Sequence, residues 1–121
     1  MNRIALVCGL LAAFAACDKK AAAPDCAAAV TAGVDRAAAG VSQPADSPLQ
    51  KEMADAQRAV VAAQKEAMTR LCVDDHWSDK MRTCLTSHEI GICASTRLTK
   101  EQRTRYRAAD DALVQGRAAG H

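Results

Sequence analysis

The clearest pattern of apolar and polar positions lies between Ser47 and Val73, and it predicts one long helix. Ser47 is a favoured N-cap residue, Pro48 suits the first helical position, and Gln50 stands three residues after the cap, as in a capping box. Apolar residues then recur every three or four positions on one face; they are Leu49, Met53, Ala56, Val60, Ala63, Ala67 and Leu71, widened on one flank by Val61, Met68 and Cys72. This is the period of an amphipathic helix, whose two stripe methionines are expected to fill a core.

A shorter helix is predicted before it, over residues 26–39. Asp25 is its expected N-cap, and Gly40 is a suitable end because glycine readily takes the left-handed conformation that ends many helices. Pro44 then interrupts any continuous helix, so residues 41–46 are interpreted as a linker.

Helical signals also follow the long helix. Ser78 is a cap for a short segment to about residue 85, and Ser87 is a second cap shortly after it. Thr99 and Gln102 form another capping box, from which a last helix is expected to reach about residue 115, where Gly116 ends it. The pattern therefore predicts an all-α domain of four or five helices.

Composition indicates that the core of this domain is thin. The 121 residues allow one small domain, alanine dominates the apolar residues, and the aromatic residues are Phe14, Trp77 and Tyr106. Apolar burial contributes about 25 cal/mol per Å², whereas ordering costs about 1.5 kcal/mol per residue. Covalent cross-links are therefore expected. The net charge of +2 is too small to indicate a nucleic-acid partner, and no small-molecule substrate is evident.

The amino terminus has the pattern of an export signal. A positive start at Arg3 precedes thirteen uncharged residues, 4–16, which are fewer than the roughly 20 needed to span a bilayer. The run ends at Cys17, and this arrangement resembles a bacterial lipobox, so residues 1–16 are predicted to be a signal peptide and Cys17 to be lipidated. Phe14 departs from the leucine usual at its position.

The alternative is ordinary secretion, with cleavage near the small-x-small residues 13–15. In the lipoprotein interpretation, residues 17–24 are a short tether and the membrane is a partner through the acyl chains of Cys17. Asp18 favours the inner membrane in the enteric sorting rule, but the rule varies between bacteria and the membrane is left open.

The number of remaining cysteines is consistent with a disulfide framework. If Cys17 carries lipid, four are left in the domain, an even number in an oxidising compartment; they are Cys26, Cys72, Cys84 and Cys93. Four cysteines allow three pairings, and the sequence does not choose among them. Each bond is expected to contribute on the order of 3 kcal/mol.

A zinc site is the competing interpretation of the same residues. Cys72 and His76 repeat the spacing of Cys84 and His88, and Cys93 follows. Three observations count against zinc. The sequence lacks a Cys-x2-Cys pair, export favours oxidation of the thiols to disulfides, and Cys26 would lack a disulfide partner. No metal, cofactor or catalytic residue is therefore predicted, and both histidines are expected to be exposed or at helix ends.

Three further features have structural interpretations. Trp77 is expected to cover the junction after the long helix, with its N–H bonded to a carbonyl. Asp74 and Asp75 are interpreted as a solvated turn. A basic cluster in the last helix is expected to be solvated, or alternatively to contact anionic lipid headgroups; it comprises Arg97, Lys100, Arg103, Arg105 and Arg107.

The segment Leu98–Gln102 is similar to the LTxxQ motif of small helical periplasmic stress proteins and chaperones, which normally carry two copies where this chain has one. More broadly, the order of the domain cysteines, Trp77-Ser78 and this segment resembles that of uncharacterised cysteine-containing bacterial envelope lipoproteins. That resemblance covers most of the mature chain and implies no activity.

The sequence therefore predicts a disulfide-stapled helical domain over residues 25–116, a frayed tail over 117–121, and an N-terminal lipid anchor. The expected location is the bacterial cell envelope, facing the periplasm. The expected function is a non-enzymatic interaction or structural module with a possible envelope protein partner; the alternative is a client-binding chaperone or stress-response protein like those with the LTxxQ motif.

Overall fold

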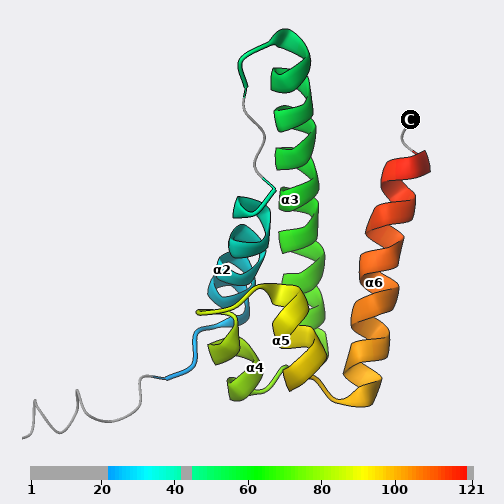
Figure 1. The fold of residues 1–121 in the computed structure, drawn as a ribbon. Coiled ribbons are helices and arrows are strands. Elements are labelled where there is room, and N and C mark those ends of the chain that lie inside the picture. Colours follow the sequence, from blue (N-terminus) through cyan, green and yellow to red (C-terminus); the bar gives the residue numbers. More distant parts are fainter. Residues whose placement is uncertain (1–21, 42–44, 120–121) are drawn as a thin grey trace, which may run out of the picture.

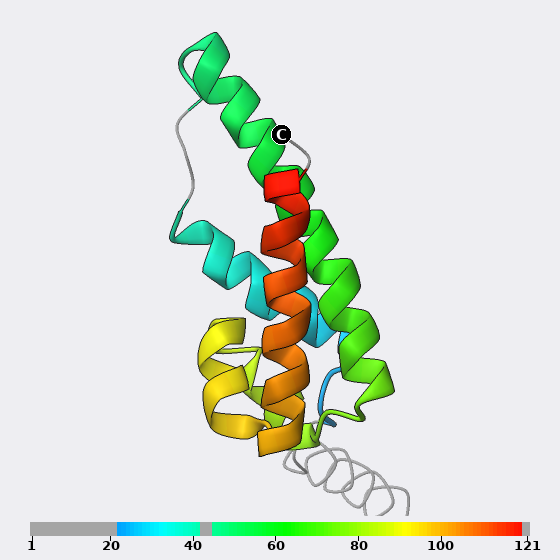
Figure 2. The same cartoon turned by 90° about the vertical axis from the view of Figure 1, so that its right-hand side faces the viewer.

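The computed structural model describes residues 22–41 and 45–119, which form five α-helices without a strand (Figure 1). The helices are α2 (Cys26–Ala39), α3 (Pro48–Asp74), α4 (Asp79–Cys84), α5 (Ile90–Arg97) and α6 (Lys100–Ala119). The predicted all-α, disulfide-stapled fold is confirmed. In Figures 1 and 2, α2 packs on the second half of α3, the short helices α4 and α5 lie beside that end, and α6 runs back along α3.

The predicted capping boxes are present at both long helices. The Ser47 hydroxyl accepts a hydrogen bond from the Gln50 N–H at 3.1 Å, while the Gln50 side chain accepts from the N–H of Asp46 at 3.0 Å. At α6 the exchange is reciprocal, because Thr99 and Gln102 each accept from the other's N–H at 3.1 Å. Local side-chain hydrogen bonds thus set where these helices begin.

A left-handed residue ends α3 and turns the chain inward. His76 has a φ of 50°, its N–H bonds to the Val73 carbonyl at 3.3 Å, and the Trp77 N–H bonds to the Cys72 carbonyl at 3.1 Å. These two bonds define a Schellman motif, with His76 in the position that glycine usually holds. The motif places Trp77 against the core.

Among the residues that the structure describes, every buried hydrophobic residue lies at one end of the molecule. They are Ala29, Val30, Val34, Met68, Cys72, Trp77, Met81, Leu85, Ile90, Cys93, Ala94 and Leu98. We call residues 22–41 and 64–107, which contain this core, the base. We call residues 45–63 and 108–116, which cover the first half of α3 and the part of α6 from Ala108 to Gly116, the open end.

The expectation that the whole apolar stripe of α3 faces the core is wrong for its first half. Leu49 is 66% exposed and Met53 is 49% exposed, whereas Met68 and Cys72, from the predicted flank, are the buried residues of α3. The reason is length: α2 has 14 residues and α3 has 27, so α2 covers only the second half of α3.

The predicted stop at Gly116 is also wrong, because α6 continues to Ala119. No described glycine has a positive φ, and Gly116 is an ordinary helical residue. Glycine within a helix costs only about 1 kcal/mol, which neighbouring helical hydrogen bonds offset. Residues 117–119 of the predicted frayed tail are therefore helical, and 120–121 lie outside the described residues.

The predicted signal peptide, Cys17 and most of the tether over 17–24 lie outside the described residues as well. Within the part of the chain that the structure describes, none of the helices is both long and apolar enough to span a membrane.

Candidate functional site

Two disulfide bonds hold the base together, and they resolve the three pairings that the sequence allowed. Cys26 pairs with Cys72 and joins α2 to α3, whereas Cys84 pairs with Cys93 and joins α4 to α5. The Cα–Cα distance is 5.8 Å in each pair, and the sequence separations are 46 and 9 residues. One bond therefore connects distant segments, and the other closes a short local loop.

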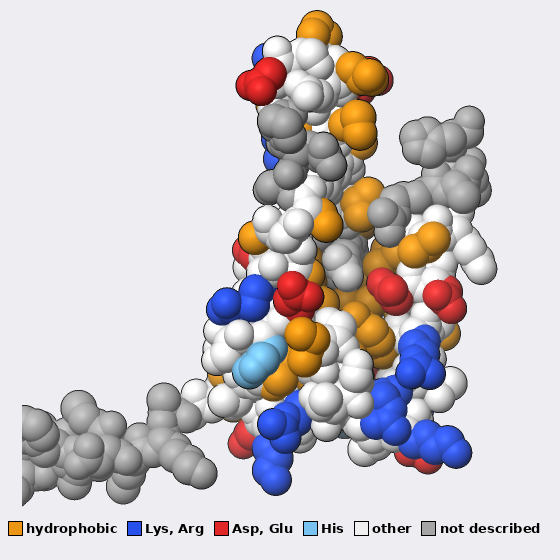
Figure 3. Space-filling model, in the orientation of Figure 1, with side chains coloured by type: hydrophobic (Ala, Val, Ile, Leu, Met, Phe, Trp, Pro, Cys, Tyr) orange, Lys and Arg blue, Asp and Glu red, His pale blue; other side chains and the backbone are white. Residues whose placement is uncertain are grey.

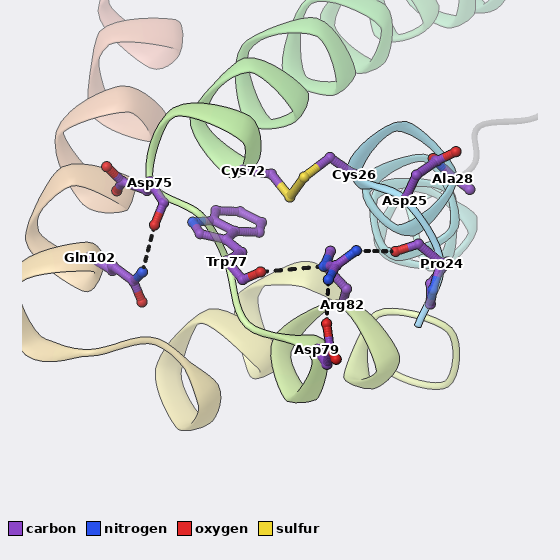
Figure 4. The surroundings of a disulfide bond; sticks show 10 residues. All are labelled: Pro24, Asp25, Cys26, Ala28, Cys72, Asp75, Trp77, Asp79, Arg82 and Gln102. Atoms are coloured by element: carbon purple, nitrogen blue, oxygen red, sulfur yellow. Dashed lines mark hydrogen bonds and ion pairs between the residues drawn. A yellow bond between two sulfur atoms is a disulfide. The ribbon is translucent and has the colours of Figure 1, made fainter. Parts of the chain in front are cut away.

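Arg82 connects three segments around the first disulfide, as Figure 4 shows. Its guanidinium donates to the Trp77 carbonyl at 3.3 Å and to the Pro24 carbonyl at 2.9 Å, and it pairs with the Asp79 carboxylate. The chain entering α2 is thus held to α4. The sequence showed Arg82 only as one more charged residue on a short helix, so this contact had no detectable signal.

Asp75 is a junction residue rather than part of a solvated turn. Its side chain is 11% exposed and accepts from Arg105 Nε at 2.8 Å, and its backbone carbonyl accepts from Gln102 Nε2 at 2.9 Å. In the same basic cluster, Arg103 donates to the Leu98 carbonyl at 3.0 Å. Two of the five basic residues therefore make contacts that fasten the start of α6, which the solvated-face interpretation did not include.

Trp77 is buried as predicted, at 3% exposure, and its ring lies 6.4 Å from the Tyr106 ring at an interplanar angle of 53°. The prediction that its indole N–H bonds to a carbonyl is wrong, since among the described residues this N–H has no partner. Burial, and then the neighbouring Asp110 carboxylate, raise the pKa of Tyr106 to about 12. The two rings add an aromatic contact between the segment after α3 and α6, beside the bonds that Asp75 makes with Gln102 and Arg105.

The residues weighed as zinc ligands separate into two groups. Cys72 is bonded to Cys26, and His76 is exposed beyond the end of α3. His88, in contrast, lies beside the second disulfide, and its ring offers a nitrogen within 4.8 Å of the sulfur atoms of Cys84 and Cys93. The same Cys-x3-His spacing therefore places His88 beside a disulfide bond, whereas it leaves His76 exposed after the end of α3.

The open end contains an apolar groove between α3 and α6. It has a volume of about 360 Å³ and is lined by Ala59, Val60, Ala63, Ala112, Leu113 and Gly116. Figure 3 shows hydrophobic side chains in the hollow between the two helices. Sequence reasoning missed this surface because it assigned the α3 stripe to the core; the signal was the stripe's extension beyond the reach of α2.

The two ends of the molecule also differ in charge. The open end has five acidic residues (Asp46, Glu52, Asp55, Asp110 and Asp111) and two basic ones (Lys51 and Arg58), so its net charge is −3. The base has ten basic and eight acidic residues, a net charge of +2 over the ranges given above. The groove is therefore apolar and lies in a part of the molecule whose net charge is negative, which favours a basic partner over an acidic one.

Comparison of the chain with protein-family models, with curated proteins and with solved structures finds no match.

Proposed function

We propose that this chain is an exported, lipid-anchored, non-enzymatic interaction module of the bacterial envelope, and that the groove at its open end binds a protein partner. The observation that carries the proposal is the uncovered apolar surface of the two helices that form the groove. Leu49 and Met53 on α3 and Val114 on α6 are each about half exposed or more, and an apolar groove lies between these helices. An apolar groove flanked by exposed apolar side chains is typical of interaction sites.

The disulfides and the amino-terminal pattern support export. Two disulfides in so small a domain suit an oxidising compartment, because cytoplasmic thiols are kept reduced. Residues 1–16 match a signal peptide, and Cys17 is the proposed lipid attachment site, with the domain facing the periplasm.

The partner that the groove fits best is an amphipathic helix with basic residues on its flanks. A helix laid into a groove between two helices buries an apolar stripe, and basic flanks would complement the net charge of −3 around it. A second copy of this chain is a poorer fit, because two open ends would bring like charges together.

The anchor is tested by metabolic labelling with a fatty-acid analogue. The intact chain is expected to take up the label and to fractionate with membranes, and Cys17→Ser is expected to lose both properties. Unlabelled protein released into the soluble envelope fraction would contradict the anchor and leave ordinary secretion.

The groove is tested by site-specific photo-crosslinking in intact cells, with the crosslinker placed at Ala63 or at Ala62. Both residues are exposed on α3, but only Ala63 lines the groove. Crosslinks from Ala63 are expected to reach a basic, amphipathic helical segment of an envelope protein, and crosslinks from Ala62 are not. Equal products from both positions, or products containing only a second copy or lipid, would contradict the proposal.

The alternative is a client-binding chaperone resembling the LTxxQ proteins, and the uncovered apolar surface also favours it. In the structure, Thr99 and Gln102 of that segment form the α6 cap and Leu98 is buried, so the motif itself stabilises the fold. Suppression of the aggregation of an unfolded client, lost in Ala63→Glu but kept in Ala62→Glu, would support this alternative; no suppression at excess would reject it.

A further inference from the structure

We propose that the segment from α4 to α5 forms a metal site when its disulfide is reduced, in which the Cys84 and Cys93 thiolates and the His88 imidazole bind one Zn²⁺ ion. The two sulfur atoms and a ring nitrogen already lie within 4.8 Å of one another. Zinc binds thiolate sulfur at about 2.3 Å and imidazole nitrogen at about 2.0–2.1 Å, so its ligand atoms are roughly 3.5 Å apart. Small side-chain rotations would therefore complete the site.

The fold holds these three residues together independently of the disulfide bond. The His88 N–H donates to the Cys84 carbonyl at 3.0 Å, so the turn after α4 keeps the two residues adjacent. Leu85 follows Cys84 and is fully buried, and Ile90 at the start of α5 is 2% exposed. Both flanking helices are thus anchored in the core, and reduction is expected to leave the ligands close to one another.

The site is open to solvent on one side. Cys84 and His88 line a broad groove of about 1000 Å³ beside α4, whereas Cys93 is buried behind them. An ion could therefore enter from the groove and be held by three protein ligands, with its fourth position facing outward and available to water. A Cys₂His set with one open position is an established zinc arrangement.

The other disulfide lacks this arrangement. His76, which has the same spacing from Cys72 as His88 has from Cys84, is exposed beyond the left-handed end of α3. Among the residues that the structure describes, only the set of Cys84, His88 and Cys93 gathers as a possible metal-binding group. The tertiary structure, rather than the spacing, therefore distinguishes the two Cys-x3-His pairs.

The disulfide and metal-bound forms exclude each other, because the same sulfur atoms are used in both. A dithiol donor would transfer two electrons and two protons to the Cys84–Cys93 bond, giving two thiols and leaving the donor as a cyclic disulfide. Binding of Zn²⁺ would then displace the two thiol protons. The newly exported, reduced chain could enter the metal-bound form without any donor. Exchange with a cyclic disulfide would reverse the reduction: the two thiolates would give two electrons to that disulfide, which becomes a dithiol with two protons from water, while the Cys84–Cys93 bond re-forms and the ion is released.

The test is titration of the full chain with Co²⁺ as a spectroscopic substitute for zinc, after anaerobic reduction with a phosphine. The phosphine carries no thiol to compete for metal, and it takes oxygen from water to become its oxide. One tightly bound Co²⁺ with thiolate charge-transfer bands is expected after reduction, and none before it. Zinc is expected to displace the cobalt.

Matched variants separate this site from the other cysteines. Cys84→Ser/Cys93→Ser retains every other thiol and is expected to lose the bands, and His88→Ala is expected to weaken affinity about tenfold or more. His76→Ala is expected to bind like the intact chain. Equal binding by the double-serine variant, or equal affinity of His88→Ala and His76→Ala, would overturn the proposal.

One variant keeps the test decisive if reduction unfolds the chain. Cys84→Asp removes the local disulfide, preserves the Cys26–Cys72 bond without a reductant, and supplies a carboxylate, which is also a zinc ligand. It is expected to bind one Co²⁺ with a single thiolate, while Cys84→Ala binds more weakly. Absence of binding in Cys84→Asp, with helicity retained by circular dichroism, would overturn the assignment.

Discussion

The base and the open end share the helices α3 and α6, yet they differ in what covers these helices. In the base, α2 packs on α3, whereas α4 and α5 pack on α2 and on each other, and every buried hydrophobic residue of the described chain lies there. At the open end, α3 has α6 beside it and a hydrogen bond from Gln57 to the Val41 carbonyl at 3.2 Å, and Leu49 and Met53 are exposed on the same helix that buries Met68. An apolar stripe on a helix therefore indicates a surface that can be buried. The neighbouring helices determine how much of that surface is buried.

The largest expected effect concerns the disulfides that make the base rigid. Loss of the Cys26–Cys72 bond in Cys26→Ala/Cys72→Ala should cost about 4 kcal/mol of unfolding free energy, because its 46-residue separation constrains the unfolded chain most. Cys84→Ala/Cys93→Ala, with a separation of 9, should cost about 3 kcal/mol. Denaturant unfolding measures both. Unchanged helicity and stability after full reduction would show that the base does not depend on its cross-links.

The next comparison uses one methionine from each region. Met81 is fully buried, so Met81→Ala should destabilise by about 3 kcal/mol through lost burial and a cavity. Met53 is 49% exposed, so Met53→Ala should change stability by less than about 0.5 kcal/mol. Similar losses in the two variants, measured by chemical denaturation, would mean that the open end is covered in solution.

Two glycines sharpen the comparison at a smaller scale. A Cβ added at Gly33 would lie 2.5 Å from Leu85 Cδ2, whereas one at Gly116 would meet nothing within 4 Å. Gly33→Ala should therefore destabilise by about 1 kcal/mol despite its better helix propensity. Gly116→Ala should stabilise by about 0.5–1 kcal/mol. Thermal unfolding of the two variants distinguishes them by the sign of the change.

The smallest effect is at the boundary between the regions, where Tyr106 titrates. Its pKa is raised from 10.0 to about 12 by burial first and by Asp110 second. The folded state therefore holds the proton more tightly than the unfolded state, so stability is unaffected below pH 10 and falls between pH 10 and pH 12. Because the ring is only partly buried, the loss should be no more than about 1 kcal/mol.

Near-UV absorbance of tyrosinate follows this titration directly, because Tyr106 is the one tyrosine in the chain. Asp110→Asn should lower the midpoint slightly, and Tyr106→Phe should remove the pH dependence assigned to this group. A midpoint close to 10 in the folded protein would show that the ring is more solvated than its contact with Trp77 implies.

Helix positions could be predicted from sequence because their causes are local. Ser47 and Thr99 cap the helices that follow them through hydrogen bonds to residues three positions away, and both were recognisable from spacing. The all-α class and the number of disulfides followed from periodicity and from counting cysteines. Which half of α3 is buried did not follow, since this depends on the length of α2.

Only the tertiary structure determined the contacts between residues that are far apart in the chain. Pairing of Cys26 with Cys72, the contact of Asp75 with Arg105, and the different surroundings of His76 and His88 all depend on how helices pack. Sequence spacing records distance along the chain, whereas these contacts depend on distance in space. Local hydrogen bonding therefore determined where the helices begin, and packing determined which surfaces they leave uncovered.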